Sequence, residues 1–336
     1  MNPGHLAEDA LRDRLRAVTN ITMRWNYRVW GFGEAIALRG LLRAGDLLGD
    51  AAPFGFVHGI LRSWLGRGVA RTNEDHVGAG RELLELHRRT HDARFLEAAR
   101  QLAALNASFP TGPNGARYHR GDTPGWRCQM WVDCMDVDGP FLAALAHATG
   151  EDRYFDHAVA ELLGYARTLQ SDTGLLFHGF ERDCGRNGEL WARGNGWALM
   201  GLVDTLALLP RTHPAWAELH QRTAALAGAL ALAQDPSGLW HTVINDSSTY
   251  LESTLAAMAA YALHEGIKHG VLEPSRYAEV ERRARAGMHA QTAPDGTLQL
   301  VSDATPVGAR AVYATRPFGT FPWGQGPLLL ALCQEL

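Results

Sequence analysis

Apolar residues recur along most of this chain with the period of an α-helix, and polar residues fall on the opposite face. Convincing alternation of apolar and polar residues, the pattern of a half-buried strand, is missing. The helical pattern covers residues 34–47, 80–90, 94–105, 139–148, 154–169, 197–209, 215–233, 251–265 and 277–289. The pattern therefore predicts an all-α protein.

A repeated segment indicates how these helices are arranged. Each copy has small residues at a helix start and then a face of leucine and alanine, and the copies begin at Gly78, Gly139, Gly194, Leu251 and Gly324. Because apolar helices rich in Gly and Ala alternate with more charged ones, we expect an inner and an outer layer. We therefore predict six helical hairpins in one (α/α)6 barrel over residues 1–336, with the first and last segments as neighbours that close the ring. Active-site residues are then expected in loops at the N-terminal ends of the inner helices.

Related turns separate the helices of successive hairpins. They read SDTG, QDPSG and APDG, and each ends in a glycine, at positions 174, 238 and 296. A turn of this kind needs a residue with positive φ, which glycine adopts at no steric cost. We expect the left-handed conformation at Gly174, Gly238 and Gly296.

Composition and charge narrow the class of protein. Of 336 residues, 46% are hydrophobic and 20% are charged, which is ordinary for a globular protein with a sizeable core. The net charge is −4 and no block of Lys or Arg is present, which argues against nucleic acid as a partner.

No apolar stretch reaches the roughly 20 residues that a membrane span requires. Acids and arginines interrupt the apolar residues of the N-terminus, so we expect no secretory signal and a cytoplasmic location. The four cysteines match no zinc pattern, and we expect them to be reduced.

The most specific motif is the heptad from Trp191 to Trp197, WARGNGW, at a helix entrance. An indole face stacks well on a sugar ring, and a guanidinium such as that of Arg193 binds a carboxylate with two N–H donors. A tight turn with core tryptophans is the alternative, which applies above all to Trp197. The motif predicts a binding site for an anionic sugar.

A second motif, QMWVD, ends in Asp133 and precedes an apolar helix. Partial burial beside an aromatic ring such as Trp131 is the environment in which a carboxylic acid stays protonated near neutral pH, as a general acid must. Capping of the next helix is the alternative role, for which Asp136 and Asp138 compete. Asp75 occupies the equivalent place one repeat earlier. Two carboxylates in one funnel would suit the cleavage of a glycoside.

The histidines offer weaker signals. His178, in GLLFHGF, ends a turn before the heptad, where an imidazole would bind a sugar hydroxyl or carboxylate, although a structural role is the commoner one for a lone histidine. His87 and His91 have i, i+4 spacing but lack the glutamate of HExxH, so we reject a zinc site. No phosphate-binding loop, dinucleotide fingerprint or GxSxG elbow is present. We expect no metal and no cofactor.

Together these motifs resemble glycoside hydrolase families 88 and 105, the unsaturated glucuronyl and rhamnogalacturonyl hydrolases. The resemblance runs in order through WGFGEAIALRGLLRA, DHVGAGRELLELHRRTHDARFLEAA, QMWVD, LLFHGF, WARGNGW, DPSGLWHTVINDSSTYLESTLAAMAAYAL and WGQGPLLLAL. It implies an (α/α)6 barrel whose acid protonates C4 of the C4=C5 double bond that a polysaccharide lyase leaves. Water then adds at C5, and the hemiketal opens and releases the rest of the sugar. The implied partner is an anionic oligosaccharide with a terminal unsaturated uronate.

The resemblance also assigns roles to residues of this chain. Asp133 matches the general acid/base, and Asp75 matches the second aspartate of the active site. Residues matched to substrate contacts are His178, Trp191, Arg193, Trp197 and His119, and Trp131 adjoins the acid.

Two departures from the family pattern leave the exact substrate open. After Asp133 the family usually has D-x-L-[FY]-M, whereas this chain has acids at Asp136 and Asp138. Near the start the family commonly has W-x-Y, whereas Phe32 here lacks the hydroxyl. The sequence leaves open whether the sugar next to the unsaturated uronate is rhamnose, a hexosamine or glucose. A sugar epimerase or an inverting glycosidase on the same barrel, and a helical-repeat scaffold that binds a protein, remain as alternatives.

Overall fold

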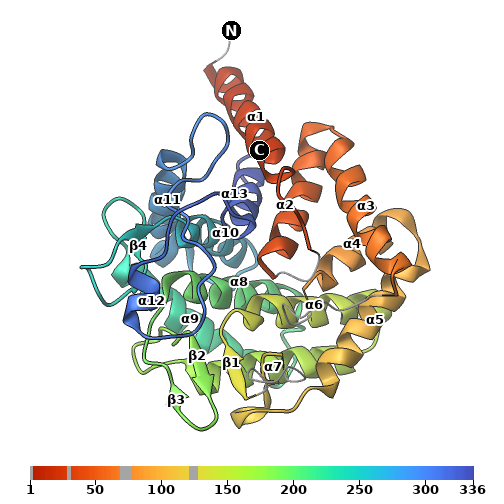
Figure 1. The fold of residues 1–336 in the computed structure, drawn as a ribbon, viewed down its shortest axis with the longest axis vertical. Helices are drawn as coiled ribbons and strands as arrows, with labels where there is room; N and C mark the ends of the chain where they lie inside the picture. Colours follow the sequence, from red (N-terminus) through yellow and green to blue (C-terminus); the bar gives the residue numbers. More distant parts are fainter. Residues whose placement is uncertain (1–2, 29–31, 69–77, 121–127) are drawn as a thin grey trace.

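The computed structural model describes residues 3–28, 32–68, 78–120 and 128–336, and its architecture is a ring of six inner helices. Each inner helix contacts the next, and the last contacts the first. In ring order they are α2 (Phe32–Leu48), α4 (Gly80–Thr90), α6 (Cys134–Thr149), α8 (Ala192–Leu208), α10 (Thr254–Lys268) and α13 (Pro322–Cys333). Figure 1 shows α13 beside α2, although the two come from opposite ends of the chain. The predicted (α/α)6 barrel is confirmed.

A second layer of helices surrounds this ring. Its members pack against the inner helices that precede or follow them in the chain. They are α1 (Pro3–Thr22), α3 (Ala52–Gly66), α5 (Ala93–Ser108), α7 (Arg153–Leu169), α9 (Trp216–Ala233) and α11 (Pro274–Ala290). Burial separates the layers: α8 is buried at every residue from 192 to 206, whereas α9 buries only its inner side. The large apolar core lies between and within the layers.

Short elements connect the helices. The described strands are β1 (Gln129–Trp131), β2 (Gly179–Glu181), β3 (Gly185–Arg186), β4 (Trp240–His241) and β5 (Leu251–Glu252), and the remaining helices are η1 (Pro113–Gly115) and α12 (Arg310–Ala314). The antiparallel pairs β1·β2, β2·β3 and β4·β5 are too short to show alternation in the sequence. The three turn glycines have φ of 93°, 84° and 91° at positions 174, 238 and 296, which confirms the prediction for these turns.

Two inner helices begin earlier than the pattern predicts. α8 begins at Ala192 because the glycine-rich heptad forms its first turn, which Asn195 fixes by hydrogen bonds to both backbone groups of Leu176 at 2.8 and 2.9 Å. Later in α8, a Cβ on Gly201 would lie 2.1 Å from the backbone oxygen of Met135, so glycine lets α6 approach α8 closely there. α6 likewise begins at Cys134 rather than Gly139. The heptad therefore forms the first turn of α8, whereas the QMWVD motif ends directly before α6.

Two sequence-based expectations, on membrane spans and on the cysteines, can be compared with the structure. In the described residues, no helix is both long enough and apolar enough to cross a membrane. All four cysteines are free thiols, as expected. The cytoplasmic location stays a prediction.

Candidate active site

The motif residues gather at the N-terminal ends of neighbouring inner helices. Asp133 directly precedes α6, Trp191 and Arg193 stand at the start of α8, and Glu252 precedes α10. His178 comes from the turn before β2, whose strand pairs with β1 just ahead of Asp133. The ring thus brings together side chains that lie far apart in the sequence.

Asp133 contacts His178. Oδ2 of Asp133 lies 3.2 Å from Nε2 of His178, and the two side chains are 3% and 0% exposed. Asp133 occupies the N-cap position of α6, yet its side chain makes no capping hydrogen bond. The carboxyl group is therefore directed at the imidazole rather than at the backbone of its helix.

Tyr313 of α12 determines which nitrogen of His178 carries the proton. Its hydroxyl oxygen accepts hydrogen bonds from Nδ2 of Asn187 at 2.9 Å and from the backbone N–H of Gly308 at 3.3 Å. The same hydroxyl lies 2.7 Å from Nδ1 of His178. With its oxygen occupied as an acceptor, the phenol donates its own proton to Nδ1. We infer that neutral His178 carries its proton on Nε2, which faces Asp133.

Aromatic and cationic groups surround this pair. The ring of Trp191 lies 4.3 Å from that of His178, and Trp131 makes an edge contact with His178 at 5.5 Å. The imidazole of His119 stacks on Trp131 at 4.7 Å with an interplanar angle of 22°, and its Nδ1 lies 3.3 Å from the sulfur of Cys134. The indole of Trp131 also donates to Gln129 at 2.9 Å. The contact of these rings with a sugar stays a prediction.

Arg193 is held by the protein on several sides. Its Nη1 donates to Glu252 at 3.2 Å and to the backbone and hydroxyl oxygens of Ser302 at 2.8 Å. Its Nη2 donates to the carbonyl of Asp303 at 2.9 Å and to the hydroxyl of Thr305 at 3.1 Å. Burial lowers the pKa of this guanidinium, and the carboxylates of Glu252 and Asp133 oppose that effect. In this structure Arg193 links residues 302–305 to α8 by hydrogen bonds. Its binding of a substrate carboxylate stays a prediction.

The other predicted site residues differ in their placement. Trp197 is fully buried and packs in the apolar core, and its contact with substrate stays a prediction. Asp75 lies outside the described residues, as do Trp30 and Gly31 of the departure near the start. Asp136 and Asp138, the acids of the second departure, are buried inside α6 rather than capping it.

Sequence reasoning missed Tyr313, Asn187 and Glu252. Tyr313 and Asn187 come from segments without a repeat, and only their hydroxyl and amide hydrogen bonds identify them. Glu252 had a signal, because it ends a short strand directly before an inner helix, close to the position that Asp133 has between β1 and α6. Its oxygens accept from Arg193 and from the backbone N–H of Thr254, so it anchors the start of α10.

No metal site is evident among residues 3–28, 32–68, 78–120 and 128–336, where no three His, Cys, Asp or Glu side chains gather closely enough to hold an ion. A reaction without a metal stays a prediction.

Comparison with known proteins places this site in a family. The family model of glycosyl hydrolase family 88 matches residues 10–336. The unsaturated rhamnogalacturonyl hydrolase YesR of Bacillus subtilis is 28% identical over 289 residues, which is 82% of this chain and 82% of that protein.

Solved structures share the fold. A possible member of the GH105 family from Salmonella enterica matches with a TM-score of 0.86 at 24% identity, over 97% of this chain and 93% of that chain. The unsaturated glucuronyl hydrolase of Bacillus sp. GL1, described as responsible for the degradation of glycosaminoglycan, matches with a TM-score of 0.69 at 18% identity, over 98% and 95% of the two chains. At these identities the structures show a common architecture.

Proposed function

The chain belongs to glycosyl hydrolase family 88, and on that premise we propose how it works: it releases a terminal 4,5-unsaturated uronic acid from lyase-generated oligosaccharides, with Asp133 as the proton donor. The observation that carries this assignment is the contact of Asp133 with His178 at the N-terminal ends of the inner helices. A carboxyl group in contact with an imidazole and surrounded by indole rings suits proton transfer to a bound sugar.

The proton path follows from the contact between Asp133 and His178. Because Nε2–H of His178 faces Oδ2 of Asp133, the proton for the substrate resides on the other carboxyl oxygen, Oδ1. Its transfer to C4 turns the double bond into a C4–H bond and leaves positive charge on C5 and the ring oxygen. Water then bonds to C5 and gives its proton back to the Asp133 carboxylate. The hemiketal opens to a ketone, and the neighbouring sugar leaves.

Two further carboxylates have separate roles in this proposal. Asp75, as the second aspartate of the site, stabilises the positive charge on C5. Glu252 instead keeps Arg193 charged and in place through their 3.2 Å contact.

The proposed substrate class is an unsaturated disaccharide from rhamnogalacturonan. The support is the relative named an unsaturated rhamnogalacturonyl hydrolase, which this chain resembles over four-fifths of both lengths. A disaccharide from chondroitin or hyaluronan is the second candidate, because the fold is shared with a glucuronyl hydrolase linked to glycosaminoglycan degradation.

The test of this function is an assay of the purified protein with unsaturated disaccharides from rhamnogalacturonan and from chondroitin, in buffer with EDTA. We expect the ultraviolet absorbance of the double bond to disappear with the rhamnogalacturonan product, and a saturated disaccharide of the same sugars to stay intact. Cleavage of the saturated sugar would instead indicate an inverting glycosidase, and an isomerised product without cleavage would indicate an epimerase.

Replacing Tyr313 by phenylalanine is expected to lower kcat about tenfold with little change in KM, the cost of one lost hydrogen bond in the proton path. The variant keeps the ring but removes the proton that Nδ1 of His178 accepts. Steady-state kinetics measure kcat and KM separately.

The matched control is Tyr250→Phe, which removes a hydroxyl that donates to the backbone carbonyl of Tyr313 at 2.9 Å. It should leave kcat unchanged. An unchanged kcat in Tyr313→Phe as well would show that the hydroxyl has no part in proton transfer.

A further inference from the structure

A short helix, α12, brings the hydroxyl of Tyr313 to His178. The helix has five residues, Arg310–Ala314, and Tyr313 is the one buried residue among them. A helix of this length is not stable by itself in water. The position of α12 at the candidate active site must therefore be set by contacts with neighbouring segments.

Arg310, the first residue of α12, joins this helix to two other segments. Its Nε donates to Oε2 of Glu189 at 2.6 Å, and its Nη1 donates to Oδ2 of Asp246 at 2.5 Å. These three residues form a cluster, the Arg310 cluster. A guanidinium is planar and carries its N–H donors in a fixed geometry, so it can hold two carboxylates in defined directions at the same time.

Glu189 connects the Arg310 cluster to His178. Its carboxylate accepts from Arg310, and its backbone carbonyl accepts from the backbone N–H of His178 at 2.9 Å. One residue thus contacts both the helix that carries Tyr313 and the histidine that Tyr313 contacts. A shift of α12 relative to Glu189 would change the 2.7 Å contact between the Tyr313 hydroxyl and Nδ1 of His178.

Asp246 connects the Arg310 cluster to Trp191. The backbone N–H of Asp246 donates to the carbonyl of Val243 at 2.9 Å, and Val243 packs with Trp191 and Tyr313 in one small apolar cluster. The carboxylate of Asp246 is also fixed by Ser248, which donates from its backbone N–H at 3.0 Å and from its hydroxyl at 2.6 Å. The second partner of the cluster therefore has a defined direction of its own.

Overall stability does not explain the Arg310 cluster well. The side chain of Arg310 is 43% exposed, and ion pairs with that much exposure contribute little to the free energy of folding. The cluster does, however, join α12 to the two segments that contact His178 and Trp191. Its geometry matches a role in positioning.

We propose that Arg310 is a positioning residue, which holds α12 so that the hydroxyl of Tyr313 stays on Nδ1 of His178. Its importance for the reaction rests on the proposed function, in which that hydroxyl determines the proton of the histidine beside Asp133. Because Arg310 acts through Tyr313, its loss should cost no more activity than the loss of the Tyr313 hydroxyl.

The first test measures the position of α12 without any substrate. Hydrogen–deuterium exchange of the whole protein, read by mass spectrometry, reports how often the backbone N–H groups of residues 308–314 open to solvent. In Arg310→Gln, which removes the charge, we expect this segment to exchange about fivefold faster. In Arg310→Lys, which keeps the charge but not the planar set of donors, the rate should lie between the two.

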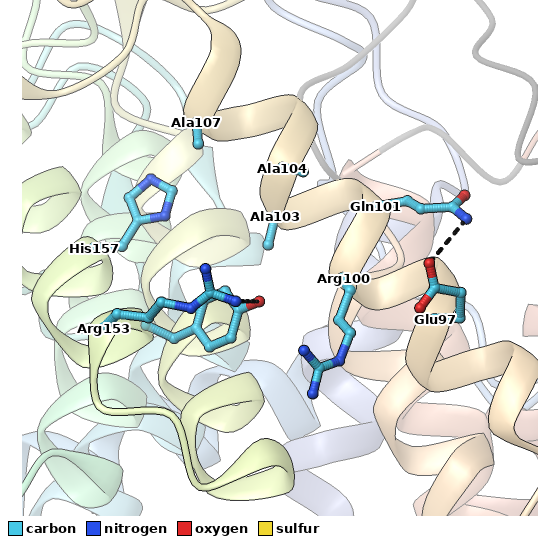
Figure 2. Close-up of a pocket in the computed structure, with 9 residues that line it drawn as sticks. Glu97, Arg100, Gln101, Ala103, Ala104, Ala107, Arg153 and His157 are labelled. Atoms are coloured by element: carbon cyan, nitrogen blue, oxygen red, sulfur yellow. Dashed lines mark hydrogen bonds between the residues drawn. The ribbon is translucent and has the colours of Figure 1, made fainter.

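The matched control is Arg100→Gln. Figure 2 shows Arg100 at a pocket of about 420 Å³ between the outer helices α5 and α7. Its side chain is 37% exposed and pairs with Glu151 at 2.6 Å, so it resembles Arg310 in exposure and in the kind of partner. This variant should leave both the exchange of residues 308–314 and the hydrolase activity unchanged. Equal exchange of this segment in Arg310→Gln and Arg100→Gln would overturn the proposal.

The second test relates the Arg310 cluster to catalysis through a double variant. Arg310→Gln should lower kcat about fivefold in the original protein, with little change in KM, and should have no further effect in Tyr313→Phe. If the two effects multiplied instead, Arg310 would act on the site by another route and the proposal would be wrong. If no unsaturated disaccharide is hydrolysed at all, the proposed function fails, and the exchange experiment still decides whether Arg310 holds α12.

Discussion

The Asp133→Asn variant is expected to hydrolyse its unsaturated disaccharide about 10³-fold more slowly than the original protein, because general acid catalysis contributes roughly that factor. Asparagine has nearly the same shape as the aspartic acid and can keep an oxygen in the place of Oδ2, 3.2 Å from Nε2 of His178, but it has no acidic proton to give to C4. Substrate binding should change little, so the loss should appear in kcat. The measurement is the initial rate of loss of double-bond absorbance.

The matched control is Asp152→Asn. Asp152 occupies the N-cap of α7 and, like Asp133, makes no capping hydrogen bond with its side chain, but it lies on the exposed outer layer. It should keep full activity. If Asp133→Asn retained a tenth of the original rate with its circular dichroism unchanged, another group would have to deliver the proton.

Replacing Arg193 by methionine should lower the free energy of unfolding by about 3–5 kcal/mol, the usual effect of removing one partner of a buried ion pair. Glu252 is 1% exposed, and without Arg193 its charge has no cationic partner at 3.2 Å. The hydrogen bonds that hold residues 302–305 to α8 are lost as well. Denaturant unfolding measures the change, and activity should fall with it.

Two further variants separate the ion pair from packing. Adding Glu252→Gln to Arg193→Met removes the uncompensated charge, so the double variant should regain part of the lost stability. Arg100→Met, which breaks the partly exposed pair of Arg100 with Glu151, should cost at most about 1 kcal/mol. A loss of this small size in Arg193→Met would mean that the buried pair contributes no more than a surface one.

The sequence was sufficient for the barrel because its inner helices carry a repeated apolar face. It was insufficient for α1 and α3. In α3 the residues Pro53, Gly55 and Gly59 interrupt the helical signal, and packing of Val57, Leu61 and Trp64 on the core overrides their weak propensity. Such helices form because they are buried against the ring, and a local sequence pattern holds no information about that burial.

For the candidate site, the sequence identified the residues that gather there better than the groups that hold them in place. Asp133, His178 and Trp191 stand in recognisable motifs and do meet in space. Tyr313 is separated from His178 by more than a hundred residues, and a lone tyrosine in a five-residue helix carries no signal. Partners of this kind are identified only from hydrogen bonds in the folded structure, where the closed ring brings distant segments together.

That closure has a consequence for how the protein is made. α2 emerges from the ribosome early, but its partner across the seam, α13, is the last helix of the barrel to be synthesised. Until α13 arrives, the nascent chain is an incomplete ring whose apolar seam is open to water and to other chains. Contacts this distant in sequence form slowly, and uncovered apolar surface is what aggregates during folding. We therefore expect chains that lack α13 to aggregate, whereas the finished barrel keeps this seam covered by α13.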